Sequence, residues 1–149
     1  MQRVTLWYKE LLLLSHFKVP RCIRLASKIR DLSLHFFCDA SSSAYASVGY
    51  LKATYANSEV SVRLIASKSR VAPLQTVSIP RQELLGAMLS VRLADKVMAS
   101  LEVKSDHVFY WSDSMTVLWW LSRHCRGLKT FVANRVAKIQ RRTALPNWN

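Results

Sequence analysis

Apolar and polar residues alternate along three successive stretches of the chain, Leu32–Asp39, Tyr45–Ala53 and Val60–Ser67. A period of two residues is typical of a strand with one buried face, and short polar stretches separate the three. Connections this short join antiparallel neighbours. The pattern therefore predicts a three-stranded antiparallel meander.

A repeat of three and four residues then runs from Leu84 to Leu101, which is the pattern of an amphipathic helix. Pro80 stands where the first helical turn is expected, since its missing N–H costs nothing there. Glu83 falls in that same expected first turn, and Lys68–Ser78 is expected to be the loop before the helix.

His107–Asp113 is a compact apolar stretch of strand type, after which Ser114–Leu121 becomes helical. A strand after a long helix is most simply parallel to an earlier strand, through a right-handed crossover. Its expected neighbour is the strand that carries Asp39. The fold class predicted is α/β: a mixed sheet with an antiparallel three-strand meander, a crossover helix and a parallel fourth strand.

Two further helices are expected outside this arrangement. Val4–Phe17 carries apolar residues at helical spacings before Pro20, and apolar residues from Phe131 to Ile139 mark a helix after Gly127. We expect residues 1–31 to form a helical lead-in, with a basic surface that is either a linker, a nucleic-acid contact or simply solvated. Residues 32–149 are expected to form the main domain.

The composition fits one domain with terminal extensions: 149 residues, of which 50% are hydrophobic. The net charge of +13 favours a polyanionic partner such as nucleic acid, although a basic surface for solubility or a fragment without its acidic part would also account for it. Basic side chains near the end of the chain are the expected phosphate contacts: Arg123, Arg126, Lys129, Arg135, Lys138, Arg141 and Arg142. The tryptophans Trp111, Trp119, Trp120 and Trp148 are expected to fill core rather than to stack on bases.

Cys22, Cys38 and Cys125 are odd in number, widely spaced and without a CxxC pair. Neither a disulfide framework nor a zinc site is indicated, and an intracellular setting fits best. The apolar run Leu11–Leu14 is too short for a membrane span, and the charges around it do not fit a signal peptide. No membrane partner and no targeting segment are expected.

Three carboxylates stand out by position: Asp39 and Asp113, each ending an apolar strand, and Glu83 near the start of the long helix. If the two strands are parallel neighbours, the aspartates lie side by side at one sheet edge, where open α/β sheets bind ligands. Hard oxygen ligands of this kind suit Mg²⁺ or Mn²⁺. Each also has an ordinary explanation: Asp39 as a turn residue, Glu83 as a favourable charge at a helix N-terminus, and Asp113 as the cap of the next helix.

The order of these motifs resembles the ribonuclease H-like region of BEL/Pao-type retrotransposon polyproteins, a family also labelled Pao retrotransposon peptidase. The matching motifs, in the family's order, are VPRC from Val19, FCDASSSAY from Phe37, ASKSRVAPL from Ala66, IPRQELLGA from Ile79, WSDSMTVLWWL from Trp111 and FVANRVAKI from Phe131. They cover nearly the whole chain.

The resemblance implies a ribonuclease H fold, hydrolysis of the RNA strand of an RNA–DNA hybrid, and a reverse transcriptase domain preceding residues 1–31 in the same polyprotein. Asp39 is then similar to the first-strand aspartate that bridges two metal ions, Glu83 to the helix glutamate and Asp113 to the fourth-strand aspartate. Two such ions would activate water and stabilise the leaving 3′ oxygen. The expected location is the cytoplasm or a virus-like particle.

The family's fourth carboxylate would follow a strand that begins near Trp148, and this chain stops at Asn149. We therefore expect a domain truncated at its C-terminus, with impaired cleavage. One alternative is a non-catalytic domain that holds hybrid or supports the polymerase.

The other alternative is an aspartic peptidase, which needs two aspartates in Asp-Thr/Ser-Gly turns. Asp39 is instead followed by Ala40 and Ser41, and Asp113 by Ser114 and Met115, which disfavours that activity.

Overall fold

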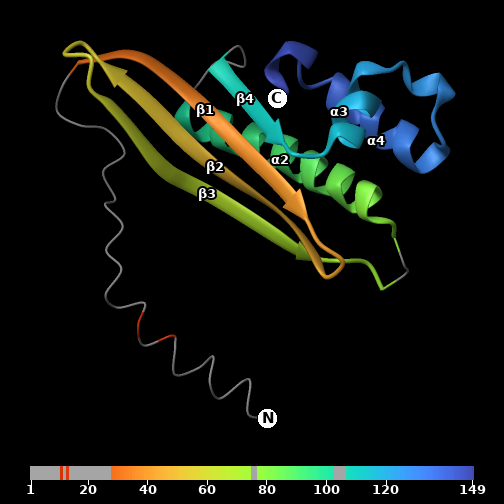
Figure 1. Ribbon diagram of the computed structural model, residues 1–149. Coiled ribbons are helices and arrows are strands. Elements are labelled where there is room, and N and C mark those ends of the chain that lie inside the picture. Colours follow the sequence, from red (N-terminus) through yellow and green to blue (C-terminus); the bar gives the residue numbers. More distant parts are fainter. Residues whose placement is uncertain (1–10, 12, 14–27, 75–76, 103–106) are drawn as a thin grey trace.

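The computed structural model describes residues 11, 13, 28–74, 77–102 and 107–149. Three long strands come first, followed by a long helix, a short strand and two shorter helices (Figure 1). The elements are β1 (Ile29–Ala40), β2 (Ala44–Tyr55), β3 (Val60–Val71), α2 (Ile79–Leu101), β4 (Val108–Ser112), α3 (Met115–Ser122), η3 (Cys125–Gly127), α4 (Thr130–Gln140) and η4 (Leu145–Asn147).

The four strands form one mixed sheet in the order β3-β2-β1-β4. β1 pairs antiparallel with β2, and β2 pairs antiparallel with β3, which confirms the meander. β4 returns after α2 and pairs parallel with β1, which confirms the crossover. The predicted mixed α/β fold is therefore correct.

Several expected boundaries differ from the structure. β1 begins at Ile29 rather than at Leu32, so it includes the last three residues of the expected lead-in. The loop expected over Lys68–Ser78 contains strand as far as Val71, because Lys68 to Val71 pairs with β2 up to Ala44 at the edge of the sheet. Polar and charged side chains are tolerated there, since the edge strand faces solvent. Glu83 is the fifth residue of α2 rather than part of its first turn, because the helix begins at Ile79.

The expected helix over Val4–Phe17 falls, apart from Leu11 and Leu13, outside the described residues. Cys38 and Cys125 are both free thiols, and Cys22 lies outside the described part of the chain. None of the helices that the structure describes has both the length and the apolar character that a membrane span requires.

The helices cover one face of the sheet (Figure 1). Leu34, Phe36 and Cys38 of β1 are buried in the core on this side, together with Leu84 and Val91 of α2. A buried hydrogen bond of 2.7 Å joins the hydroxyls of Ser47 on β2 and Ser90 on α2. Because both groups are removed from water, each needs the other as a partner, and the bond fixes the helix on the sheet.

The residues of β1 and β4 that alternate with the buried ones include exposed aromatic side chains. Phe37 is 42% exposed and stacks on Trp111 with ring centroids 5.7 Å apart. Trp148 fills core as expected, since it is buried and stacks on Tyr110 at 4.7 Å, and Trp120 is partly buried against the core. The expectation of a core role is wrong for Trp111, which is 36% exposed, and for Trp119, which is 51% exposed with the guanidinium of Arg123 4.8 Å from its ring centroid.

The end of the chain lies beside β4. Trp148 forms an isolated parallel bridge with Tyr110, and the N–H of Asn149 donates to the carbonyl of Tyr110 at 2.9 Å. Extended pairing thus begins near Trp148, where the family resemblance implied a further strand.

Gly49 lies in close contact with the core. A Cβ at this position would be 2.5 Å from Cε1 of Phe36, a fully buried ring that stacks on Tyr110 and cannot move aside. We predict that Gly49→Ala lowers the free energy of unfolding by about 1–3 kcal/mol through overpacking. Urea unfolding followed by circular dichroism measures this.

Gly127→Ala is the matched control, since a Cβ there meets no atom within 4 Å. Equal unfolding midpoints for Gly49→Ala and the unsubstituted protein would contradict the tight packing described.

Candidate functional site

Asp39 and Asp113 both follow the point where the parallel pairing of β1 with β4 ends. The last parallel pair is Cys38 with Ser112. Asp39 is the next residue of β1, where it still pairs with Ala46 of β2, and Asp113 is the first residue after β4. Both aspartates are exposed, although Cys38 beside them is buried. The structure thus brings these two predicted site residues to one edge of the sheet.

Glu83 reaches the same region from α2. Its Oε2 accepts a 2.6 Å hydrogen bond from the hydroxyl of Ser114, the residue directly after Asp113. Gly86, one turn further along α2, lies so close to β1 that a Cβ there would be 3.2 Å from the carbonyl oxygen of Asp39. Both contacts hold the start of α2 at the ends of β1 and β4.

The cap of α3 is Ser114 rather than Asp113. The Ser114 hydroxyl accepts a hydrogen bond from the backbone N–H of Val117 while it donates to Glu83. Asp113 therefore does not serve as the helix cap, one of the ordinary explanations for its position. Ser114 was not singled out from the sequence, although a Ser at the start of a predicted helix is a recognised capping signal.

The donor chemistry of the three carboxylates fits a hard divalent cation. Their side chains do not yet form a ligand set: in the described ranges no three His, Cys, Asp or Glu residues are placed to hold a metal ion. Oδ1 of Asp39 accepts from the adjacent N–H of Ala40 at 2.6 Å, and Oε2 of Glu83 is occupied by Ser114. Each carboxylate retains a second oxygen that no described hydrogen bond uses.

The pKa of the Cys38 thiol reflects its burial and the charges of the two aspartates. Burial raises the pKa of its thiol to about 11, and the negative charges of Asp113 and Asp39 act in the same direction. Hydrogen bonding to Ser90 and Ser112 acts in the opposite direction and only partly offsets burial. The thiol is therefore neutral at physiological pH and is a packing residue rather than a nucleophile.

The seven predicted basic contacts lie between α3 and α4, on α4, and directly after it. Arg123, Arg126 and Lys129 lie along the connection from α3 to α4. Arg135 and Lys138 lie on α4 and line a cavity, whereas Arg142 pairs with Asp95 at 2.9 Å. Arg141 caps the end of α4.

We predict that Ser114→Ala lowers the free energy of unfolding by about 1 kcal/mol, because α3 loses its N-cap. The same change removes the hydrogen bond to Glu83. Chemical denaturation measures the loss, with Ser122→Ala as control, because Ser122 is exposed and bonds only to the carbonyl of Trp119 in the last turn of α3. Equal losses in the two variants would be inconsistent with a special role for Ser114.

The raised pKa of Cys38 predicts a pH dependence of stability. The folded state holds the thiol proton up to about pH 11, whereas the unfolded thiol releases it near pH 9.0. The resulting stability is fully present below pH 9.0 and is lost as the pH rises toward 11, by at most about 1.4 kcal/mol per pH unit.

Urea unfolding in EDTA-containing buffers from pH 8 to 11 measures this slope. Cys38→Ala should show a shallower decline than the unsubstituted protein. Identical slopes in the two proteins would rule out the proposed contribution.

The solved structures that resemble the chain include three ribonuclease H structures. The N-terminal RNase H domain of a Mycobacterium tuberculosis protein, solved as a fusion with maltose-binding protein, is 10% identical, covers 76% of this chain and 77% of its own, and has a TM-score of 0.49. LC11-RNase H1 in complex with an RNA/DNA hybrid is 11% identical over 79% and 81%, with a TM-score of 0.47. RNase H1 from the archaeon Halobacterium salinarum is 9% identical over 78% and 80%, with a TM-score of 0.44.

No curated protein matches this sequence. A family model does match it, described as the Pao retrotransposon-like RNaseH-like domain, over residues 1–114. This match includes Asp39, Glu83 and Asp113 and covers more than half of the chain. The chain therefore belongs to the Pao retrotransposon-like RNaseH-like domain family.

Proposed function

We propose that this protein is a retroelement ribonuclease H domain that cleaves the RNA strand of an RNA–DNA hybrid with Mg²⁺ or Mn²⁺. The observation that carries the proposal is that Asp39 and Asp113 directly follow the last parallel pair of β1 and β4, with Glu83 hydrogen-bonded to Ser114, the residue after Asp113. Membership of an RNase H-like family supports the same conclusion.

The three carboxylates would hold the cation. Asp39 and Asp113 offer exposed oxygens at the edge of the sheet, and Glu83 offers its second oxygen from α2. A divalent cation bound there would supply Lewis-acid activation of water and stabilise the charge of the leaving oxygen.

Ser114 orients Glu83 in this proposal. Its hydroxyl is buried and fixed by two hydrogen bonds, one to the start of α3 and one to the carboxylate. The donor thus restricts the rotation of Glu83 and keeps its charge facing the strand ends.

Hybrid recognition would depend on shape and phosphate charge rather than on base sequence. An RNA-containing duplex exposes 2′-hydroxyls and phosphates in its wide minor groove. The net charge of +13 gives a favourable field for such a substrate. We further propose that residues 1–31 connect the domain to a reverse transcriptase in the same polyprotein, inside the cell or a virus-like particle.

A second candidate is a non-catalytic domain that binds hybrid and supports the polymerase. The observation that favours it is that two of the carboxylates already accept hydrogen bonds from the protein. Oδ1 of Asp39 accepts from the N–H of Ala40, and Oε2 of Glu83 accepts from the hydroxyl of Ser114. The two candidates differ in cleavage and agree in binding.

We predict that Asp39→Asn lowers Mg²⁺-dependent cleavage of an RNA–DNA hybrid at least about 100-fold, since loss of a ligand charge costs several kcal/mol of transition-state stabilisation. Hybrid affinity measured in Ca²⁺ or EDTA should change little. A labelled RNA strand resolved on a denaturing gel measures cleavage.

Asp31→Asn is the matched control, because Asp31 is an exposed aspartate on the same strand, 3.6 Å from His107. Binding without any cleavage by the unsubstituted protein would support the second candidate. Equal cleavage by the Asp39→Asn variant and the unsubstituted protein would refute the proposed site.

A further inference from the structure

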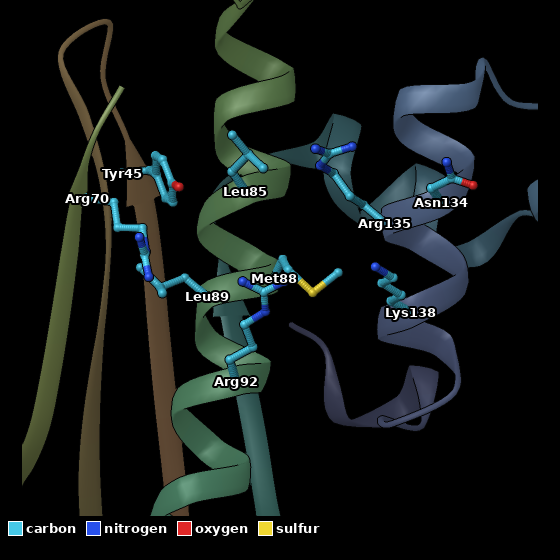
Figure 2. Close-up of a pocket in the computed structure, with 9 residues that line it drawn as sticks. All are labelled: Tyr45, Arg70, Leu85, Met88, Leu89, Arg92, Asn134, Arg135 and Lys138. Carbon is cyan, nitrogen blue, oxygen red and sulfur yellow. The ribbon is translucent and has the colours of Figure 1, made fainter. Parts of the chain in front are cut away.

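A cavity of about 290 Å³ lies between the start of β2, the end of β3, the middle of α2, and α4 (Figure 2). Four cationic side chains line it, and they come from three elements: Arg70 from β3, Arg92 from α2, and Arg135 and Lys138 from α4. No acidic side chain is among the described residues that line it. The cavity is therefore strongly electropositive.

The charges of the cavity are not neutralised from within the described part of the protein, where no carboxylate forms an ion pair with Arg70, Arg92 or Lys138. The nearest acidic residue along α2 is Asp95, three positions after Arg92, and it pairs with Arg142 at 2.9 Å. Bringing like charges together without a counter-charge raises the energy of the folded state. An anion in the cavity would remove this cost.

Arg135 shows the effect of this environment. Burial lowers the pKa of its guanidinium, and the positive charge of Arg92 acts in the same direction, whereas Tyr45 acts in the opposite one. The side chain is nonetheless held in place: its Nη1 donates to the carbonyl of Phe131 at 2.9 Å, and its guanidinium lies 3.5 Å from the ring centroid. A fixed guanidinium loses little entropy when it binds an anion.

The remaining lining suits a phosphate group. Tyr45 and Asn134 also line the cavity and add a hydroxyl and a side-chain amide. Leu85, Met88 and Leu89 of α2 form an apolar wall. Hydrogen bonds from guanidinium groups to phosphate are charge-assisted, frequently bidentate, and stronger next to an apolar wall than in open water.

We propose that this cavity binds a phosphate group, and that the group belongs to a nucleic-acid backbone. The inference rests on the proposed function for its ligand, an RNA–DNA hybrid, but uses different residues. Arg92 follows Glu83 by nine residues of α2, roughly 13 Å along the helix axis at 1.5 Å per residue, and nine residues at 3.6 per turn place the two side chains on opposite sides of the helix. The cavity would therefore contact a part of the nucleic acid away from the cleavage site.

The test is fluorescence anisotropy of a labelled 12-base-pair RNA–DNA hybrid with the full chain in EDTA, over a range of salt concentrations. Arg92→Gln and Arg70→Gln should each weaken binding about three- to ten-fold, and the slope of log affinity against log salt should fall by about one. Both residues are exposed, so the substitutions leave the core intact.

Lys96→Gln is the matched control. Lys96 is an exposed cation on α2, one turn beyond Arg92, and does not line the cavity. The affinity of the Lys96→Gln variant for the hybrid should stay within two-fold of that of the unsubstituted protein. If Lys96→Gln weakens binding as much as Arg92→Gln, or if neither cavity variant weakens it, the inference is overturned while the cleavage test of Asp39 stands unaffected.

A second measurement separates the sources of phosphate. Inorganic phosphate is titrated into the protein while the side-chain N–H resonances of its arginines are followed by NMR. Shifts of Arg92 and Arg135 together with weakened hybrid binding in the cavity variants support a backbone phosphate. The same shifts with unchanged hybrid binding would indicate a site for free phosphate and overturn the nucleic-acid assignment.

Discussion

The first turns of α2 can lie directly against the carboxyl end of β1 because Gly86 has no side chain. A Cβ there would approach the carbonyl oxygen of Asp39 to 3.2 Å and the Cβ of Cys38 to 3.6 Å. The buried hydrogen bond between Ser47 and Ser90 fixes the helix one turn further on. This close seating determines where Glu83 lies relative to the two strand ends, and the candidate site depends on it.

α2 also separates two regions of opposite charge. Its start faces the ends of β1 and β4, where acidic side chains gather, and its middle carries Arg92 into a cavity lined by cations. In a nucleic acid with a bound cation, the cation would match the acidic region and the phosphates would match the cavity.

Much of the fold could be predicted from the sequence because Leu34, Phe36 and Cys38, all buried, alternate with residues of which Phe37 and Asp39 are exposed, and this period of two marks a strand with one buried face. The crossover followed from the position of a strand after a long helix. The end of β3 could not be predicted, since residues 68–71 are held by backbone pairing at a solvent-exposed edge, which places few demands on their side chains.

The site was partly predictable for a related reason. Asp39 and Asp113 were conspicuous as charges at the ends of apolar strands, but Ser114 is an ordinary residue whose two hydrogen bonds appear only in three dimensions. The basic cavity was hidden because Arg70 and Arg135 are far apart in sequence. Trp119 was misjudged because a large ring beside apolar residues usually fills core, whereas here it is exposed under Arg123.

The most direct test of the central claim, that these carboxylates form a divalent cation site, is paramagnetic broadening of backbone amide resonances by Mn²⁺. The account predicts that low Mn²⁺ concentrations broaden the amides of Ala40, Gly86 and Ser114 first, and that Asp39→Asn removes the effect. Broadening centred elsewhere, or identical in the Asp39→Asn variant, would contradict it.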